Sequence, residues 1–226
     1  GDDGLKPFYN FKPDITEIAN VLEKKPFPPE KRSMLADELE RQYAHFNLDS
    51  DHPVRHNIES IRHHNTFTVT TGQQIHIFLG PLYVLYKVLS CIATADELNK
   101  KYTDRHFVPI FWMASEDHDF EEIRDVKVYG DEFEWKRQSG GAVGRMSTTG
   151  LEELSDALEE RLDHTDFNSQ YLRIFRKAYS KNQSFASATR EVLHTLFGDS
   201  GLVVLEPDSE ILKSQIKDIV KNDVLN

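Results

Sequence analysis

The sequence contains a single cysteine, Cys91, among its 226 residues. One cysteine excludes a disulfide within the chain and is the usage expected in the reducing cytoplasm. No apolar run approaches the roughly 18 residues that a membrane-spanning helix needs, and the start, Gly1 to Gly4, is polar and acidic and lacks the apolar stretch of an export signal. We therefore expect a cytoplasmic protein with no membrane partner.

Basic residues are also scarce, because 27 Lys and Arg stand against 38 Asp and Glu, a formal net charge of −11. Nucleic acids and anionic lipids attract basic surfaces, so the composition argues against both as partners and leaves room only for a local basic pocket. Hydrophobic residues make up 38% of the chain and charged residues 29%, the balance of a globular protein.

Helical periodicity and proline breaks dominate residues 1–64. Asp14, followed by Glu17, resembles a capping box ahead of a short apolar stripe, and prolines then interrupt the chain between positions 26 and 29. Two more helical stripes follow, at 35–46 and from Pro53 onward. We expect these residues to form a helical region that packs on the remainder, residues 65–226.

The pattern changes at Thr66–Thr71, a β-branched and aromatic run that predicts a strand ending at Gly72. A long helix is predicted to start at Pro81, with apolar residues around most of its circumference, and a nearly continuous apolar run at 107–114 predicts a strand buried on both faces. Strand, helix and buried strand form a βαβ unit, which implies a parallel sheet. Pro109 is tolerable near the start of that strand or at an edge.

The rest of the chain predicts a small β insertion at about 125–150, made of a hairpin turning at Gly130-Asp131 and a loop rich in Gly, Ser and Thr. Helices are expected at 151–162, 167–180 and 184–197, a third parallel strand at 201–205, and a helical pattern from 211 to 225. The fold class is therefore α/β, a Rossmann-like parallel sheet with an amino-terminal helical region.

Polar residues follow the first predicted strand, where ligands of open parallel sheets bind. The stretch runs from Thr71 through Gly72, Gln73 and Gln74 to Gly80 and Tyr83, with Lys87 further along the helix. A glycine loop that enters a helix amino-terminus suits a phosphate or carboxylate. The alternative is that Gly72 only ends the strand, Gly80 only begins the helix and Lys87 is solvated. The spacing matches neither a dinucleotide fingerprint nor a Walker A loop.

An acidic cluster, Glu116, Asp117, His118 and Asp119, follows the buried strand. It could bind a metal, hold a substrate amine or serve in acid–base catalysis, or it could simply cap a solvated turn. No second histidine or cysteine stands at ligand spacing, so we favour amine or ribose recognition and expect no metal. Trp112 either packs in the core or lines the pocket from the strand end. Arg145 lies in a loop that is a mobile lid, a second anion contact through Arg145, or simply a flexible loop.

Because parallel strands end at the same edge of a sheet, both polar stretches are expected to meet there. Together with the runs Val69–Gln74, Gly80–Tyr83, Val108–Trp112, Val143–Met146 and Leu196–Val203, they resemble the bacillithiol-biosynthesis cysteine-adding enzyme family (BshC).

This resemblance implies a Rossmann-like core related to class I aminoacyl-tRNA synthetases and the joining of L-cysteine to glucosaminyl-malate. It also implies adenine-nucleotide (ATP or ADP) binding and a homodimer built partly on a coiled coil. We predict a catalytic group and a substrate- or nucleotide-binding group, with no metal ligands. The catalytic group is Asp117, His118 and Glu116, and the binding group is Thr71, Gly72, Gln73, Gln74, Gly80, Tyr83, Lys87, Trp112, Asp119 and Arg145.

Two departures from the family pattern stand out. Ile75-His76-Ile77 and Leu79 replace smaller residues in the loop, which is expected to narrow it or alter what binds there. Members of the family are also much longer, so this chain is expected to lack part of the active site. The alternative functions are a non-catalytic nucleotide-binding or assembly domain and a metal-dependent hydrolase.

Overall fold

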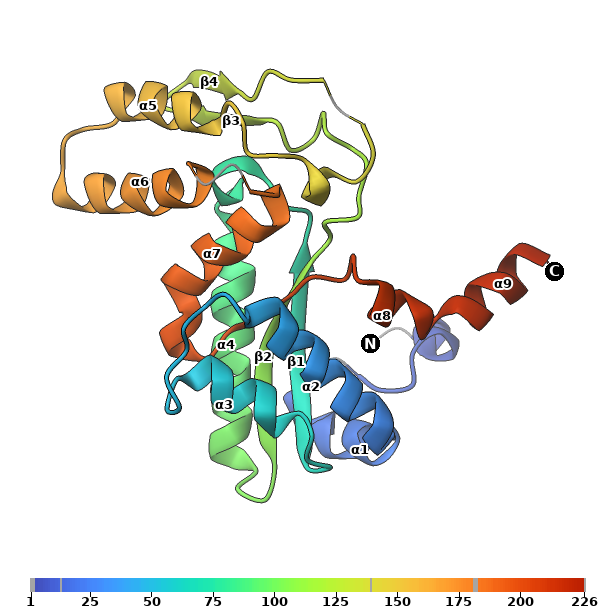
Figure 1. The fold of residues 1–226 in the computed structure, drawn as a ribbon. Helices are drawn as coiled ribbons and strands as arrows, with labels where there is room; N and C mark the ends of the chain where they lie inside the picture. Colours follow the sequence, from blue (N-terminus) through green and yellow to red (C-terminus); the bar gives the residue numbers. More distant parts are fainter. Residues whose placement is uncertain (1–2, 13, 139, 181–182, 226) are drawn as a thin grey trace.

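The computed structural model describes residues 3–12, 14–138, 140–180 and 183–225. At its centre lies a parallel sheet of three strands in the order β1-β2-β5 (Figure 1). Strand β1 spans Thr66–Gln73, β2 spans His106–Met113 and β5 spans Val203–Leu205. This sheet confirms the predicted α/β class, with parallel strands joined through helices.

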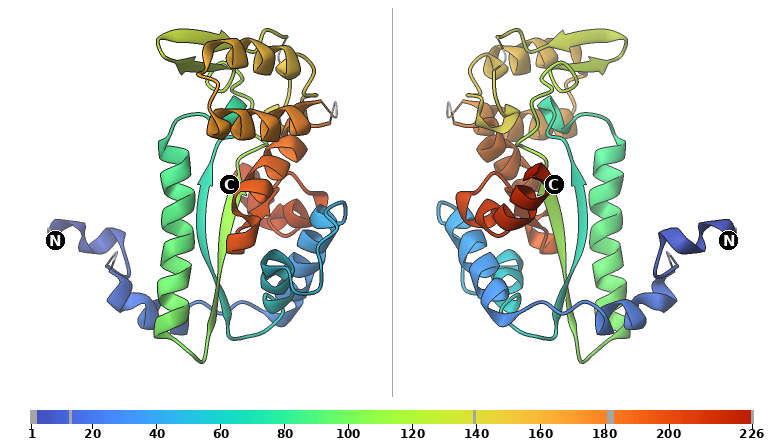
Figure 2. Two further views of the ribbon diagram at one scale, coloured as in Figure 1. Left: turned by 90° about the vertical axis from the view of Figure 1, so that its left-hand side faces the viewer. Right: turned by 90° about the vertical axis from the view of Figure 1, so that its right-hand side faces the viewer.

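Helices cover both faces of the sheet. Helix α4 (Tyr83–Lys101) lies on one face, while α2 (Pro29–Tyr43), α3 (Pro53–Ser60) and α7 (Phe185–Phe197) lie on the other (Figure 2). Buried side chains of α2 and α3 belong to the same hydrophobic cluster as those of β2 and β5. The amino-terminal helices therefore share the core of the sheet.

Strand β2 is the middle strand although it contains Pro109. Residues Thr66 to Gln73 of β1 pair with it along its full length, whereas β5 pairs only with Ile110, Phe111 and Trp112. At Pro109 the strand thus has one partner, and the missing N–H of proline is tolerated as it is in an edge strand.

Helix α4 differs from the prediction in two respects. It begins at Tyr83, two residues after Pro81. Its apolar residues are also not buried all round, because Leu82, just before its first residue, and Tyr86 and Leu89 within it are at least half exposed. The helix is amphipathic in this structure: Val84, Val88 and Leu98 face the sheet side of the core and the opposite side faces solvent.

A second layer of elements lies beyond the carboxyl ends of the strands. The hairpin of β3 (Asp125–Val128) and β4 (Asp131–Glu134), with α5 (Leu151–Arg161) and α6 (Asp166–Tyr179), stands above the tip of β1 (Figure 1). The hairpin turns at Tyr129 and Gly130, one residue earlier than predicted, and both have positive φ. Positive φ at both central residues is the geometry of a type I′ turn.

The remaining elements are short or peripheral. They are η1 (Asp3–Phe8), η2 (Ile15–Glu17), α1 (Ile18–Glu23), η3 (Ile77–Leu79), η4 (Val143–Arg145), η5 (Gly198–Ser200), α8 (Glu210–Ser214) and α9 (Lys217–Leu225). Of the helices within the described residues, none combines the length and apolar character needed to cross a bilayer.

Candidate active site at the carboxyl ends of the strands

The two polar stretches predicted to converge do meet. Gln74, directly after β1, donates from Nε2 to Oδ2 of Asp117, four residues after β2, at 2.8 Å. The residues that follow β1, β2 and β5 thus form one edge, which we call the strand-end rim: residues 73–74, 114–119 and 206–208. What these residues do in function stays a prediction.

Gly72 is not part of a loop. It lies within β1, paired with Trp112 of β2, and a Cβ placed on it would lie 3.1 Å from the Trp112 Cβ and carbonyl oxygen. The expectation of a glycine loop with free N–H groups at this position is therefore wrong. The strand continues one residue further than predicted, to Gln73, because glycine lets β1 and β2 approach closely beside Trp112.

Lys87 reaches back from α4 to the end of β1. Its Nζ donates to the Gly72 carbonyl oxygen at 2.6 Å and to the Gln73 Oε1 at 3.0 Å. Both acceptors are neutral, and no carboxylate within the described residues lies within 4.0 Å of this ammonium. Lys87, Thr71 and Tyr83 line a surface hollow of about 410 Å³. Two of the three N–H donors of Lys87 are thus used by these contacts.

The loop between β1 and α4 is buried rather than open. Ile75, Ile77 and Leu79 are each at most 5% exposed, and the Phe78 amide donates to the Tyr179 hydroxyl of α6 at 2.9 Å. These apolar residues of the loop therefore fill the core beneath α6. Gly80, with φ 66°, makes the turn into α4, and a Cβ there would lie 2.7 Å from His76.

The acidic stretch after β2 is folded into a tight loop. Oδ1 of Asp117 accepts from the Asp119 amide at 2.9 Å, and the Asp117 carbonyl accepts from the Val143 amide at 2.7 Å. His118 and Asp119 are exposed, whereas Oε2 of Glu116 is buried and has no hydrogen-bond partner among the described residues. The loop thus presents an imidazole and a carboxylate to solvent beside the Gln74–Asp117 contact.

Arg145 belongs to η4, which packs on the acidic loop through Gly144. The Gly144 amide donates to the Ser115 carbonyl at 2.8 Å. Arg145 binds Asp208 through two hydrogen bonds, from Nε at 2.5 Å and from Nη2 at 2.8 Å. The guanidinium is therefore already paired, so the structure does not present it as a free anion contact. Trp112, 43% exposed, lies at the end of β2.

A third part of the rim follows β5. The Ser115 hydroxyl donates to Glu206, which receives a further hydrogen bond from the Asp208 amide at 3.3 Å. Burial raises the pKa of the Glu206 carboxyl above its ordinary value. Hydrogen bonds from Arg145 and Lys213 lower the pKa of Asp208 to about 2, so this carboxylate is ionised at neutral pH.

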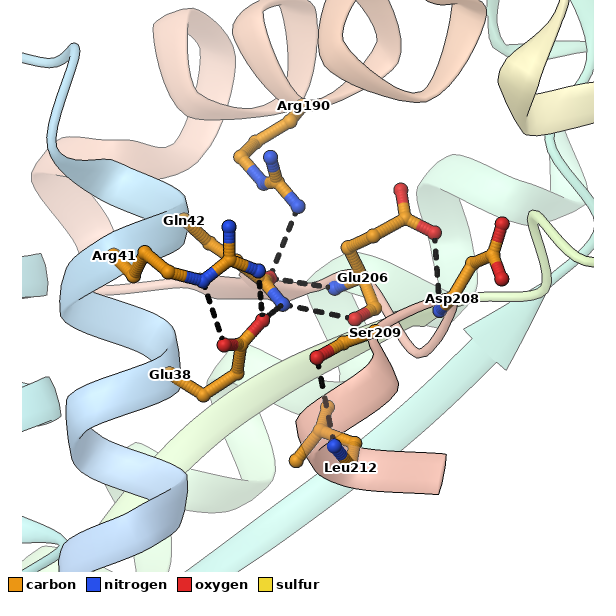
Figure 3. Close-up of polar contacts among 8 residues, drawn as sticks. All are labelled: Glu38, Arg41, Gln42, Arg190, Glu206, Asp208, Ser209 and Leu212. Carbon is orange, nitrogen blue, oxygen red and sulfur yellow. Dashed lines mark hydrogen bonds and ion pairs between the residues drawn. The ribbon is translucent and has the colours of Figure 1, made fainter. Parts of the chain in front are cut away.

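The segment after β5 is held to α2 by a buried network (Figure 3). The Gln42 Nε2 donates to the Glu206 carbonyl oxygen at 2.9 Å and to Oε1 of Glu38 at 2.8 Å. The Gln42 Oε1 accepts from the Glu206 amide at 2.9 Å and from Nη2 of Arg190 at 3.0 Å. Glu38 also pairs with Arg41. Burial alone would raise the pKa of Glu38, but hydrogen bonds from Arg41, Gln42 and Ser209, together with the Arg41 charge, lower it below its ordinary value.

Sequence reasoning missed this third part. Glu206 and Asp208 follow a predicted strand, and the rule applied to the first two strand ends would have found them at the third. Gln42 and Arg190 carry no such signal, because they lie in helices far from any strand end in sequence. No group of three or more His, Cys, Asp and Glu in the described ranges is arranged to hold a metal ion.

Comparison with known proteins shows the family of the chain. A family model described as the amino-terminal Rossmann-like domain of bacillithiol biosynthesis BshC matches residues 1–226. The chain is 38% identical over 225 residues to a protein of Flavobacterium psychrophilum, covering 98% of this chain and 42% of that protein.

Two further relatives come from Cytophaga hutchinsonii, 36% identical over 97% of this chain, and Flavobacterium johnsoniae, 39% identical over 92% of it. All three relatives carry the name "Putative cysteine ligase BshC". The chain spans 40% of the length of each of these two proteins. The chain belongs to the BshC family, in which it corresponds to the amino-terminal Rossmann-like domain.

Proposed function

We propose that the full-length protein containing this chain is a cysteine ligase of bacillithiol biosynthesis, which joins L-cysteine to glucosaminyl-malate through an amide bond. Family membership supports the activity, and the Gln74–Asp117 contact, which joins two strand ends, supports our proposal that it takes place at the rim. Open parallel sheets bind their ligands at this edge.

One oxygen of the cysteine carboxyl group must become a leaving group before the amine can attack. A bound adenine nucleotide would supply the phosphate or nucleotide group that activates this oxygen. Lys87 fits an anionic phosphate, because its ammonium has two neutral partners. Gly72 does not fit a phosphate loop of free backbone amides, because it lies within strand β1. We assign Lys87 and Thr71 to this anion.

The acidic loop supplies groups for the attacking amine. The amine of glucosaminyl-malate must lose a proton as its nitrogen bonds to the cysteine carbonyl carbon, and the oxygen of the activated carboxyl departs with the phosphate or nucleotide. His118 and Asp119 are exposed at the rim and accept this proton in our proposal. Asp117, held by Gln74, fixes the loop that carries them.

The test is product formation by the full-length protein given L-cysteine, glucosaminyl-malate and ATP, followed by mass spectrometry. The Asp117→Asn/His118→Ala double variant is expected to lower turnover at least about 100-fold while its melting temperature stays near that of wild type. The matched control is Asp96→Asn/His164→Ala, because both residues are exposed and lie outside the rim. Wild-type turnover by the first variant would remove these residues from the mechanism.

The family resemblance further supports a homodimer in the cytoplasm for the full-length protein. Light scattering of the purified protein should give twice the mass of one chain. Nucleotide binding without amide formation under these conditions would instead favour a non-catalytic binding domain.

A further inference from the structure

A cavity of about 370 Å³ opens between α2, η4, the start of α7 and the segment after β5. Its volume lies within the roughly 300–1,000 Å³ of small-molecule sites. Its lining includes Arg41, Arg145, Ser184, Arg190, Glu206 and Asp208. We call it the Arg190 cavity.

Two of its cations already have partners. Arg41 pairs with Glu38, with Nη2 and Oε1 2.6 Å apart, and Arg145 pairs with Asp208. Asp208 in turn is satisfied by Arg145 and Lys213. These paired groups form part of the cavity wall, and their charges are already neutralised within the protein.

Arg190 is different, because its charge is not neutralised. The side chain reaches from α7 toward Gln42 and the segment that carries Glu206 (Figure 3). The residue is 5% exposed, and its single hydrogen bond goes to the neutral amide oxygen of Gln42. Its Nε is buried without a partner, and no carboxylate in the described part of the chain lies within 4.0 Å. A buried guanidinium without an anionic partner has an unfavourable desolvation free energy, which a bound anion would offset.

Glu206 is the complementary group. Oε1 of its carboxylate accepts from Ser115 and from the Asp208 amide, and no described residue bonds its Oε2. Burial raises its pKa, and the hydrogen bond from Ser115 and the nearby Arg190 charge oppose that shift only in part. Arg190 and Glu206 thus line the same cavity with unlike charges that are not paired to each other.

The amino-terminus of α7 adds to the positive side. Ser184 caps this 13-residue helix by accepting from the Ser187 amide at 3.2 Å, and both serines line the cavity. The positive end of the helix dipole therefore lies at the wall of the cavity that Arg190 also lines, which favours a carboxylate there.

We propose that the Arg190 cavity binds a free α-amino acid, with its carboxylate on Arg190 and the α7 amino-terminus and its ammonium on Glu206. A zwitterion supplies both charges that the cavity lacks, whereas a simple anion would satisfy only Arg190. This inference rests on the proposed function for the identity of the amino acid, which is then L-cysteine held beside the acidic loop.

The ligand side of the test uses wild-type full-length protein and isothermal titration calorimetry. L-cysteine is compared with cysteamine, which lacks the carboxylate, and with 3-mercaptopropionate, which lacks the ammonium. Each truncated ligand is expected to bind at least about 10-fold more weakly, because each loses charge-assisted hydrogen bonds. Equal affinity for cysteamine and cysteine would overturn the proposal without any variant.

The protein side uses Arg190→Gln and Glu206→Gln, with Arg173→Gln as the control because Arg173 is exposed on α6. Arg190→Gln should weaken cysteine about 10- to 100-fold and leave cysteamine unchanged. Glu206→Gln should weaken cysteine and cysteamine and leave 3-mercaptopropionate unchanged. An unaltered preference for cysteine over cysteamine in Arg190→Gln contradicts the proposal. Should either variant not fold, the wild-type comparison decides.

The same titrations with L-serine and L-alanine separate this inference from the proposed function. If one of these binds in place of cysteine with the same dependence on Arg190, the cavity is an amino-acid site and the cysteine ligase proposal fails. If Arg190→Gln makes the amide product at the wild-type rate and affinity, the ligase proposal stands and this inference fails. Binding of no amino acid overturns it outright.

Discussion

Single residues hold the strand-end rim together through close backbone contacts. Gly144 of η4 packs against Ser115, and a Cβ on Gly144 would lie 2.5 Å from the Ser115 Cβ and 2.8 Å from its carbonyl oxygen. Neither atom belongs to the far end of a flexible side chain. The rim and η4 therefore must move apart to accept any larger residue here.

Gly144→Ala is expected to lower the free energy of unfolding by about 1–3 kcal/mol, because overpacking forces backbone shifts. Gly140→Ala is the matched control, since a Cβ there meets nothing within 4 Å. Urea denaturation of both variants measures the difference. Equal stability of the two would show that η4 does not pack on Ser115 as described.

Asp208 should make stability depend on pH. Its pKa falls from 3.8 unfolded to about 2 folded, so its contribution is present above pH 3.8 and is lost as the pH falls toward 2. Asp208→Asn should therefore cost about 1 kcal/mol at pH 7, a modest value because Arg145 and Lys213 are about half exposed or more. Urea midpoints at pH 7 and pH 3 should show this cost shrinking. A cost that is constant with pH would contradict the assigned ion pairs.

The sequence predicted which distant residues would meet only where strand ends marked them. Gln74 and Asp117 were expected to lie close together because each follows a strand of a parallel sheet. Gln42 and Arg190 were not, because they are 148 residues apart and meet only when α2 and α7 pack on the same face of the sheet. Nothing in the local sequence of a helix records which distant helix it will contact.

Among the secondary-structure elements, the hairpin shows how far local chemistry decides a turn. Tyr129 has φ 51° and is 68% exposed, and it is followed by Gly130 with φ 91°. A bulky residue with positive φ is strained, whereas asparagine adopts this conformation readily. The predicted turn was one residue late because tyrosine is an uncommon first residue of a type I′ turn.

Tyr129→Asn is expected to raise the free energy of unfolding by up to about 1 kcal/mol, because it relieves strain at an exposed position. Gly130→Ala should act in the opposite direction, by a similar amount. Thermal melting of the two variants provides the comparison. A stabilising Gly130→Ala change would show that the turn is not of the described type.

In helix α4, the apolar periodicity predicts the helix but not which of its apolar residues are buried. Its apolar positions predicted a long helix, but they also suggested burial on nearly all sides. In the structure Tyr86 is 63% exposed and Leu89 is 50% exposed. The pattern reports that a residue is apolar, and the tertiary arrangement decides which apolar residues are covered.

At the scale of the whole molecule, the residues that follow the three strands lie at one edge of the sheet. Elements η4 and α7 line the cavity beside this edge. That the three strands are parallel members of one sheet could be anticipated from the βαβ unit and from the third apolar strand, but their order was not predicted. The Arg190 cavity could not, because it is assembled from four separate stretches of chain. The fold thus follows largely from patterns along the sequence, and the site follows from packing.

The measurement that tests the central claim most directly is a crystal structure of the full-length protein with L-selenocysteine under reducing conditions, using the anomalous signal of selenium. Our account predicts a selenium peak beside the strand-end rim, between the Asp117 loop and the Arg190 cavity. A peak at the amino ends of the strands, or on the outer side of α4, would contradict it.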